Sequence, residues 1–273
     1  MSKHKRNENG RAPQHITYVG HATVLIEMGG VRLLTDPILR GHVAHLSHRA
    51  RHISPDHFQD LDAVLISHLH WDHVDWPSLR RLGRQTRLIV PHGSAAFFAR
   101  GGFKNLEELR AGEETQLGGV TVQATQAVHD GRRYPRGPFA QPVGYLVNGS
   151  QSVYFAGDTD IFPGMAHLSE NLDVALLPVW GWGPTLGAGH LTPDRAALAL
   201  TLLQPQVAIP IHWGALHPIG MGLLHPAFLT QPPVAFARHA AELAPQVDTH
   251  ILSVGDTFAL AGVNGANSAA PAG

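Results

Sequence analysis

The chain of 273 residues contains no cysteine. Disulfide bonds, iron–sulfur clusters and thiolate-ligated zinc are therefore excluded, and histidine, aspartate and glutamate remain as the strong metal ligands. Net charge is also nearly absent, at -1 with a sequence pI near 7.1, so the overall charge attracts neither nucleic acid nor an anionic membrane. What is abundant instead is histidine, with 20 residues.

Long apolar runs are missing as well. No segment approaches the roughly 20 apolar residues of a membrane-spanning helix, and the polar N-terminus lacks the apolar core of a signal peptide. We therefore expect a cytoplasmic protein without a transmembrane segment, and its oligomeric state is left open. Residues 1–14 and 262–273 are predicted to be disordered tails because neither can bury enough apolar surface, and residues 15–261 are predicted to form a single domain.

Short apolar runs that end at Gly, Pro or Asp recur along the chain. They predict about a dozen strands, which exceeds one ordinary open sheet and favours two. Helical segments interleave with the strands. The clearest follows Thr192, which suits an N-cap, while Pro193 suits the first helical position and Asp194 the positive end of the helix dipole. Two sheets packed face to face and covered by helices are therefore expected.

The segment LISHLHWDHVD, residues 65–75, places four potential ligands directly after an apolar run. His68 and His70 lie two residues apart at the end of a predicted strand, so both imidazoles can point toward one ion. Asp72 and His73 follow on a turn, where adjacent side chains point elsewhere and suit a second ion nearby. The spacing therefore favours two metals, although chance clustering is a real alternative in a chain with 20 histidines.

A dinuclear site needs ligands from other strand ends. Three candidates follow predicted strands, namely His129 after VTVQATQAV, Asp158 after SVYFAG, and His212 after VAIPI. Taken alone, each has a simpler explanation, as a histidine with its hydrogen bonds satisfied or as an aspartate in a turn. Together, the three complete a ligand set for two ions. By contrast, the histidine-rich residues 41–52 are interpreted as a solvated loop or flap, and His21 as a structural residue at a sheet end.

Through HLHWDH, AVHD, AGDTD and PIHWG, roughly residues 15–260 resemble the metallo-β-lactamase-fold hydrolases. The stretches ITYVGHATVLIEMGGVRLLTDPIL and GHLTPD resemble the branch that contains N-acyl-phosphatidylethanolamine phospholipase D and its bacterial relatives. The resemblance implies an α/β fold, a four-layer αββα sandwich of two mixed β-sheets flanked by helices. It also implies the following ligand sets: His68, His70 and His129 on one metal, Asp72, His73 and His212 on the other, and Asp158 bridging both.

Such a centre activates water. Two divalent ions about 3.5 to 4 Å apart lower the pKa of a bridging water from about 15.7 to about 7 and so supply a hydroxide nucleophile. Asp72 can also orient that hydroxide, and His190, which the resemblance places beside the metals, is a candidate proton donor or oxyanion partner. Zinc suits sulfur-free nitrogen and oxygen ligation best, while manganese and iron are compatible. His70 stands where the family's oxygen-reducing diiron members usually carry Glu, which favours hydrolysis.

Two loops are candidates for substrate contacts. Arg132, Arg133 and Arg136 follow His129, and guanidinium groups suit phosphate, so an anionic substrate is our hypothesis and a solvated basic loop the alternative. Arg132 and Arg136 are the candidate substrate contacts. Trp182 precedes His190 and is a candidate wall residue, with ordinary packing as its alternative.

The predicted function is therefore a dinuclear hydrolase of a small-molecule or lipid-like phosphodiester. Hydrolysis of a lactone or amide is the alternative on the same site, because the activated hydroxide can equally attack a carbonyl carbon. A non-catalytic metal-binding or interaction module is the alternative of another class. Nucleic acid is the disfavoured partner, because the net charge is not basic.

Overall fold

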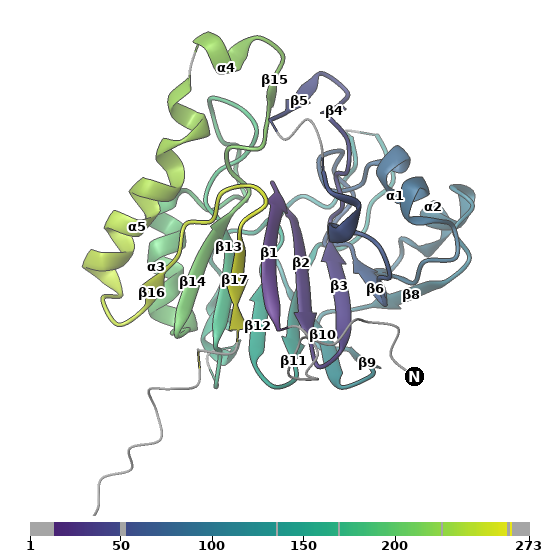
Figure 1. Cartoon of the computed structure of the whole chain (residues 1–273), viewed down its shortest axis with the longest axis horizontal. Helices are drawn as coiled ribbons and strands as arrows, with labels where there is room; N and C mark the ends of the chain where they lie inside the picture. The colour runs from purple at the N-terminus through teal and green to yellow at the C-terminus, as the bar shows by residue number, and fades with distance from the viewer. Residues whose placement is uncertain are drawn as a thin grey trace, which may run out of the picture.

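The computed structural model describes residues 14–49, 53–134, 136–168, 170–224, 226–260 and 263. Two mixed sheets pack against each other and helices cover both outer faces, which gives the four predicted layers (Figure 1). Apart from residues 14 and 263, the tails predicted at 1–14 and 262–273 lie outside the described residues. The single domain over residues 15–261 stays a prediction.

The first sheet is antiparallel at its amino-terminal strands and parallel from β3 onward. Its strands in spatial order are β17 (Thr257–Ala259), β1 (His15–Gly20), β2 (Thr23–Met28), β3 (Val31–Thr35), β6 (Ala63–Leu65), β7 (Leu88–Pro91) and β8 (Leu106–Leu109).

The second sheet is also mixed, antiparallel from β9 to β12 and parallel from β12 to β16. Its strands in spatial order are β16 (Asp248–Thr249), β14 (Val207–Ile211), β13 (Val174–Pro178), β12 (Ser152–Phe155), β11 (Val143–Asn148), β10 (Val120–Gln126) and β9 (Glu114–Leu117). Because β10 and β12 both run antiparallel to β11, the carboxyl ends of β10, β12, β13 and β14 meet at one edge.

The α-helices of the described residues are α1 (Trp76–Leu82), α2 (Ala95–Arg100), α3 (Pro193–Leu203), α4 (Met221–Leu224) and α5 (Gln231–Leu243). The 3₁₀ turns are η1 (Pro55–His57), η2 (Pro163–Leu168) and η3 (Pro226–Leu229). Pro193 occupies the first helical turn of α3 as predicted, but the Thr192 side chain makes no capping hydrogen bond and instead donates to Asp194 Oδ1 at 2.5 Å. No helix in the described ranges is long and apolar enough to cross a membrane.

Alternation along the strands explains the layers. In β2, Val24 and Ile26 pack into the core between the two sheets, while Leu25 faces the opposite way and packs with Leu79 of α1. In β13, Leu176 joins the core between the sheets and its neighbours face α3 and α5. Both sheets are thus apolar on both faces, as sheets covered by helices must be.

The histidine-rich segment does not form the solvated loop that we expected. It contains β4 (His42–Val43) and β5 (Leu46–His48), and these two strands form a third, three-stranded sheet in which β5 lies between β4 and β15 (Leu216–Pro218). Figure 1 shows this small sheet above the edge at which the carboxyl ends of β10, β12, β13 and β14 meet. The segment folds because Val43, Leu46 and Leu216 bury an apolar cluster of their own. Residues 50–52 of the segment lie outside the described residues.

Candidate metal centre

The loop between β6 and α1 carries four of the predicted ligands, and local hydrogen bonds fix its shape. The backbone amides of His73 and Val74 both donate to the carbonyl oxygen of His70, which turns the chain sharply. Asp75 then accepts from the amide of Ser78 and caps α1. His68 and His73 are fully buried, so the loop points these rings into the protein and not into solvent.

One group of three imidazoles converges from two loops. His70 Nδ1 lies 3.0 Å from His68 Nε2 and 3.0 Å from His129 Nε2. His129 reaches this point because it follows β10, whose carboxyl end lies at the same edge of the second sheet as those of β12 to β14. The three nitrogens form a face that suits one ion.

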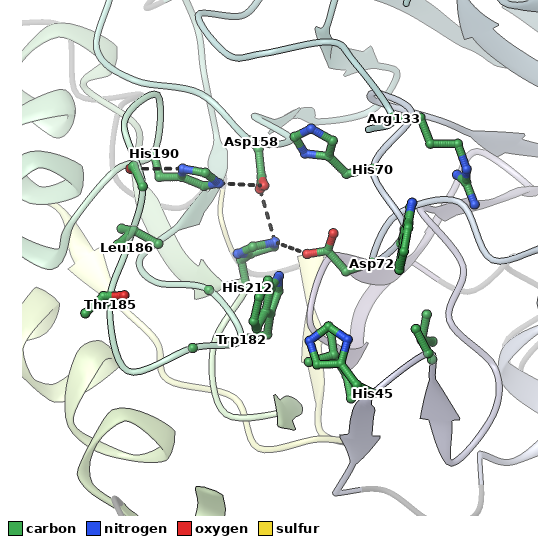
Figure 2. A pocket seen from close by; sticks show the side chains of 17 residues that line it. His45, His70, Asp72, Arg133, Asp158, Trp182, Thr185, Leu186, His190 and His212 are labelled. Atoms are coloured by element: carbon green, nitrogen blue, oxygen red, sulfur yellow. Dashed lines mark hydrogen bonds and ion pairs between the residues drawn. The ribbon is translucent and has the colours of Figure 1, made fainter. Parts of the chain in front are cut away.

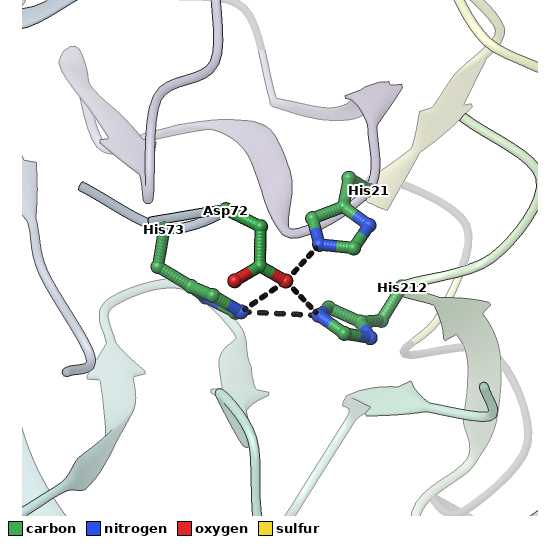
Figure 3. Close-up of side chains that lie close together, drawn as sticks. All are labelled: His21, Asp72, His73 and His212. Carbon is green, nitrogen blue, oxygen red and sulfur yellow. Dashed lines mark hydrogen bonds and ion pairs between the residues drawn. The ribbon is translucent and has the colours of Figure 1, made fainter. Parts of the chain in front are cut away.

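A second group lies beside the first and is drawn in Figure 3. His73 Nε2 and His212 Nε2 are 3.0 Å apart, and each lies 3.6 Å from Asp72 Oδ2. His212 directly follows β14 and adopts a left-handed backbone conformation, with φ of 62°. The structure thus gathers the residues that the sequence assigned to a second ion.

Asp158 stands between the two groups. Its Oδ2 lies 3.2 Å from His73 Nε2, and its Oδ1 lies 3.2 Å from His212 Nε2. Toward the first group, Oδ2 lies 3.9 Å from His68 Nε2 and 4.0 Å from His129 Nε2. The carboxylate is almost fully buried, and it has nitrogen atoms of both groups around it, as a bridging ligand requires.

Three of the predicted ligand histidines have one ring nitrogen that faces into the centre and an outer nitrogen that faces away from it. The hydrogen bond of the outer nitrogen determines whether the other nitrogen has a free lone pair. His73 Nδ1 lies 2.8 Å from Asp36 Oδ2, and His212 Nδ1 lies 2.7 Å from the carbonyl oxygen of Trp180. Neutral rings that donate at Nδ1 have bare Nε2 lone pairs, and these face each other at 3.0 Å. His129 is held in the same way, with Nδ1 2.8 Å from the carbonyl oxygen of Gly189. Facing lone pairs repel unless a cation lies between them, so this donor set fits metal ions.

The charge states of two carboxylates and two histidines of the centre agree with metal binding. Burial raises the pKa of Asp72 and Asp158, but the surrounding histidines outweigh it and hold both pKa values well below the usual range. Burial lowers the pKa of His68 well below its ordinary value and that of His129 to about 4. These groups therefore supply carboxylates and neutral imidazoles, which are the forms that bind metals. His73 differs, because burial lowers its pKa but the charges of Asp158, Asp72 and Asp36 outweigh burial and raise the pKa well above its ordinary value, so an ion that binds here must displace the Nε2 proton of His73.

His21 is a residue of this centre that the sequence reasoning left outside. It is fully buried at the end of β1, and its Nε2 lies 2.8 Å from Asp72 Oδ2. The signal that pointed to it was its place in the stretch that resembles the phospholipase branch. Seven ligands were already assigned, so it was interpreted as structural only.

A cavity of about 500 Å³ opens beside the centre (Figure 2). Trp182 lines it, as predicted, and so does His45 from the turn between β4 and β5, whose ring meets the Trp182 indole edge-on at 5.5 Å. Arg132 and Arg136 are exposed and are not among the residues that line this cavity. Their role as substrate contacts stays a prediction, and Arg133 is the arginine that faces the cavity.

Arg133 also ties two loops of the centre together. Its Nη1 donates to the carbonyl oxygen of Leu69 at 2.8 Å, and its Nη2 donates to that of Val74 at 3.1 Å. These carbonyls flank His70, Asp72 and His73 on the ligand loop. The guanidinium thus clasps the ligand loop from the segment that begins at His129, which gives it a positioning role.

We expect Arg133→Gln to lower the free energy of unfolding by about 1 to 3 kcal/mol, because two charge-assisted hydrogen bonds are lost in a partly buried place. Arg132→Gln is the matched control, since that exposed side chain only stacks over Phe139 and should change stability by less than about 0.5 kcal/mol. Chemical denaturation of both variants measures the difference. Equal stability of the two variants would show that the clasp contributes nothing.

His190 approaches the centre from the loop before α3. Its Nε2 lies 3.4 Å from Asp158 Oδ2, while Nδ1 lies 3.1 Å from the carbonyl oxygen of Gly187. Burial lowers the pKa of His190, but the hydrogen bond to Asp158 and its charge outweigh burial and raise the pKa to about 9. The ring lines the cavity and is partly accessible, so it can act on a molecule bound there.

Comparison with known proteins places these residues in a family. The family model described as "Beta-lactamase superfamily domain" matches residues 31–213. A metal-dependent hydrolase from Methanopyrus kandleri is 34% identical over 250 residues, which cover 89% of this chain and 98% of the relative. An N-acyl-phosphatidylethanolamine-hydrolyzing phospholipase D from Caenorhabditis elegans is 28% identical over 75% of this chain and 64% of its own length.

Solved structures agree on the fold. The metallo-β-lactamase fold protein YhfI from Bacillus subtilis has a TM-score of 0.65 and 16% identity, over 91% of this chain and 99% of its own. CmlA, a diiron β-hydroxylase from Streptomyces venezuelae, has a TM-score of 0.70 and 22% identity, over 91% of this chain and 54% of its own. The predicted fold, a sandwich of two mixed sheets between helices, is thereby confirmed.

Proposed function

The chain belongs to the β-lactamase superfamily, and from that membership we propose that it is a dinuclear metal-dependent hydrolase whose preferred substrates are phosphodiesters. The observation that carries the proposal is the position of Asp158. Its two oxygens each lie 3.2 Å from a histidine of the second group, and Oδ2 lies 3.9 Å from His68 of the first. A carboxylate placed in this way serves two neighbouring ions.

The residues divide into three tasks in this proposal. His68, His70 and His129 hold one ion, Asp72, His73 and His212 hold the other, and Asp158 is shared. When bound, two divalent ions make a water molecule acidic enough to attack at neutral pH and polarise the oxygen of the substrate. Zinc is our proposed metal because the donors are imidazoles and carboxylates without sulfur.

The chain's own groups complete the chemistry around that water. Asp72 Oδ2 accepts a hydrogen bond from His21 Nε2, and the other carboxylate oxygen is left available to orient the attacking water. His190 faces the cavity and can donate a proton to the leaving group as it departs. Trp182 and Leu186 exclude water from one side of the cavity and offer an apolar wall to the substrate.

Phosphodiesters are preferred over the other bond classes on two grounds. The seven donors would hold paired ions, and such a pair suits displacement at phosphorus because it can stabilise charge on both the attacking and the leaving oxygen. The phospholipase D from Caenorhabditis elegans, which covers 75% of this chain, adds support from a relative. Hydrolysis of a lactone or amide is the second candidate, because the same water can attack a carbonyl carbon. A non-catalytic module is disfavoured because all seven donors are present and are buried or partly buried.

Metal analysis followed by a substrate panel tests the proposal. We expect two equivalents of zinc per chain by mass spectrometry, and turnover of bis(p-nitrophenyl) phosphate that exceeds turnover of γ-lactones and of a β-lactam. Chelation should remove the activity, and added zinc should restore it. Faster turnover of the lactones would instead support the second candidate, hydrolysis of a lactone or amide. Iron as the bound metal, with oxygen consumption and no hydrolysis, would favour chemistry of the kind named for the diiron neighbour.

A further inference from the structure

His21 lies near enough to Asp72, His73 and His212 to join them at an ion, but its hydrogen bonding sets it apart from those three residues. We propose that it is a positioning residue, whose Nε2–H holds the Asp72 carboxylate in place for the second ion. The inference rests on the dinuclear centre of the proposed function. His21 Nε2 lies 2.8 Å from Asp72 Oδ2, and the ring is fully buried (Figure 3).

The outer nitrogens separate His21 from the ligands. His73, His129 and His212 each place Nδ1 within 2.8 Å of a carboxylate or carbonyl oxygen, so Nε2 is left bare for an ion. His21 Nδ1 is buried and has no hydrogen-bond partner among the residues that the structure describes. Among the described residues, the carboxylate of Asp72 is thus the one hydrogen-bond partner of the His21 ring. An imidazole that donates to a carboxylate from Nε2 has no lone pair at that nitrogen for a metal.

Packing fixes His21 against a second ligand as well. The His21 ring lies 3.8 Å from the His212 ring, centroid to centroid. The backbone amide of His212 donates to the carbonyl oxygen of His21 at 2.8 Å. His21 therefore joins the end of β1 in the first sheet to two members of the second group, one from each side of the sandwich.

The backbone at His21 adds an independent sign of selection for this ring. Its φ of 57° lies in the left-handed region, which glycine adopts without the steric cost that a side chain adds. Residues held in such conformations cluster at functional sites, where the surroundings over-determine them. The neighbouring Gly20, with φ of 129°, turns the strand so that the imidazole points at Asp72.

Outer hydrogen bonds of this kind tune metal affinity, because they fix the orientation of the ligand and its basicity. Without the donor, the Asp72 carboxylate would lose one of its fixed partners and could rotate away from His73 and His212. We therefore expect the second ion to be held more weakly and the first ion, on His68, His70 and His129, to be unaffected.

Two amide substitutions test whether the centre needs a hydrogen-bond donor at the place of His21 Nε2 or only a side chain that fills the space. In His21→Gln the amide nitrogen reaches the place of Nε2 and can donate to Asp72, whereas in His21→Asn it reaches only the place of Nδ1. Asparagine suits the left-handed backbone better than glutamine does, so backbone strain favours the variant that lacks the donor. A loss confined to His21→Asn is then not a strain effect.

Zinc titrations of the three full-length proteins against a competing chelator give the two dissociation constants directly. We expect His21→Asn to weaken the second ion by about 10- to 100-fold and His21→Gln to stay within about 3-fold of the unsubstituted protein. Thermal unfolding of the metal-free proteins checks that both variants fold. Unchanged affinities in His21→Asn would overturn the positioning role, and an equal loss in both variants would show that His21 is itself a ligand. An unsubstituted protein that binds fewer than two ions would instead overturn the proposed function.

Discussion

Replacing Asp158 by asparagine is expected to abolish measurable hydrolysis and to leave the protein with at most one tightly bound ion. The carboxylate is buried between the two ligand groups, within 4.0 Å of a nitrogen of each of His68, His73, His129 and His212. An amide of the same size retains one weakly coordinating oxygen and removes the charge that offsets two dications. Because paired ions supply several kcal/mol of transition-state stabilisation, we expect kcat/KM to fall by about a thousandfold or more.

Asp160→Asn is the matched control for that variant. Asp160 lies two residues further along the same loop, but its Oδ1 accepts hydrogen bonds from Arg195 and takes no part in either ligand group. This control should keep two zinc ions and most of the activity. Mass spectrometry of the bound metal and steady-state kinetics measure both properties. Two retained ions and near-normal turnover in Asp158→Asn would contradict a bridging role.

That these seven side chains lie close together was predictable, because strand topology and residue spacing act on the same positions. His68 and His70 are two positions apart after a strand, and His129, Asp158 and His212 each follow a strand that ends at the same edge. Strand ends can be read from short apolar runs, and the carboxyl ends of strands that run in one direction meet. The two packed sheets were predictable for the same reason, since the runs that form them end at clear turn residues.

Other features depend on contacts that no local pattern encodes. His21 and Asp72 are 51 residues apart, and their hydrogen bond exists only because the end of β1 lies over the ligand loop. The histidine-rich segment looks like a loop in the sequence, because the strand that pairs with β5 is β15, which lies far away along the chain. The choice of Arg133 over Arg132 for the cavity follows from the turn of its loop, which adjacent arginines do not reveal.

His190→Gln is expected to lower kcat by about 100- to 10,000-fold while both ions stay bound, the range typical for loss of a positioned general acid. His190 Nε2 lies 3.4 Å from Asp158 Oδ2, and His190 is near enough to His129 and Asp158 to join them at an ion, but the proposed assignment fills both ligand groups without it. His167→Gln is a matched control, because His167 is an exposed histidine of η2. Loss of an ion together with activity in His190→Gln would identify His190 as a ligand and contradict its role as proton donor.

The pH profile distinguishes proton donation from simple hydrogen bonding. A general acid must be protonated, so the rate should fall as pH rises through the pKa of His190. The nearby Asp158 carboxylate raises that pKa to about 9 when no ion shares its charge. Ions bound at Asp158 would offset its negative charge and repel a positive imidazolium, and both effects lower the pKa of His190. The alkaline limb of the pH profile should therefore lie below pH 9 in the zinc enzyme. The limb should vanish in His190→Gln, because glutamine does not titrate, whereas a limb that persists at the same pH would assign it to another group.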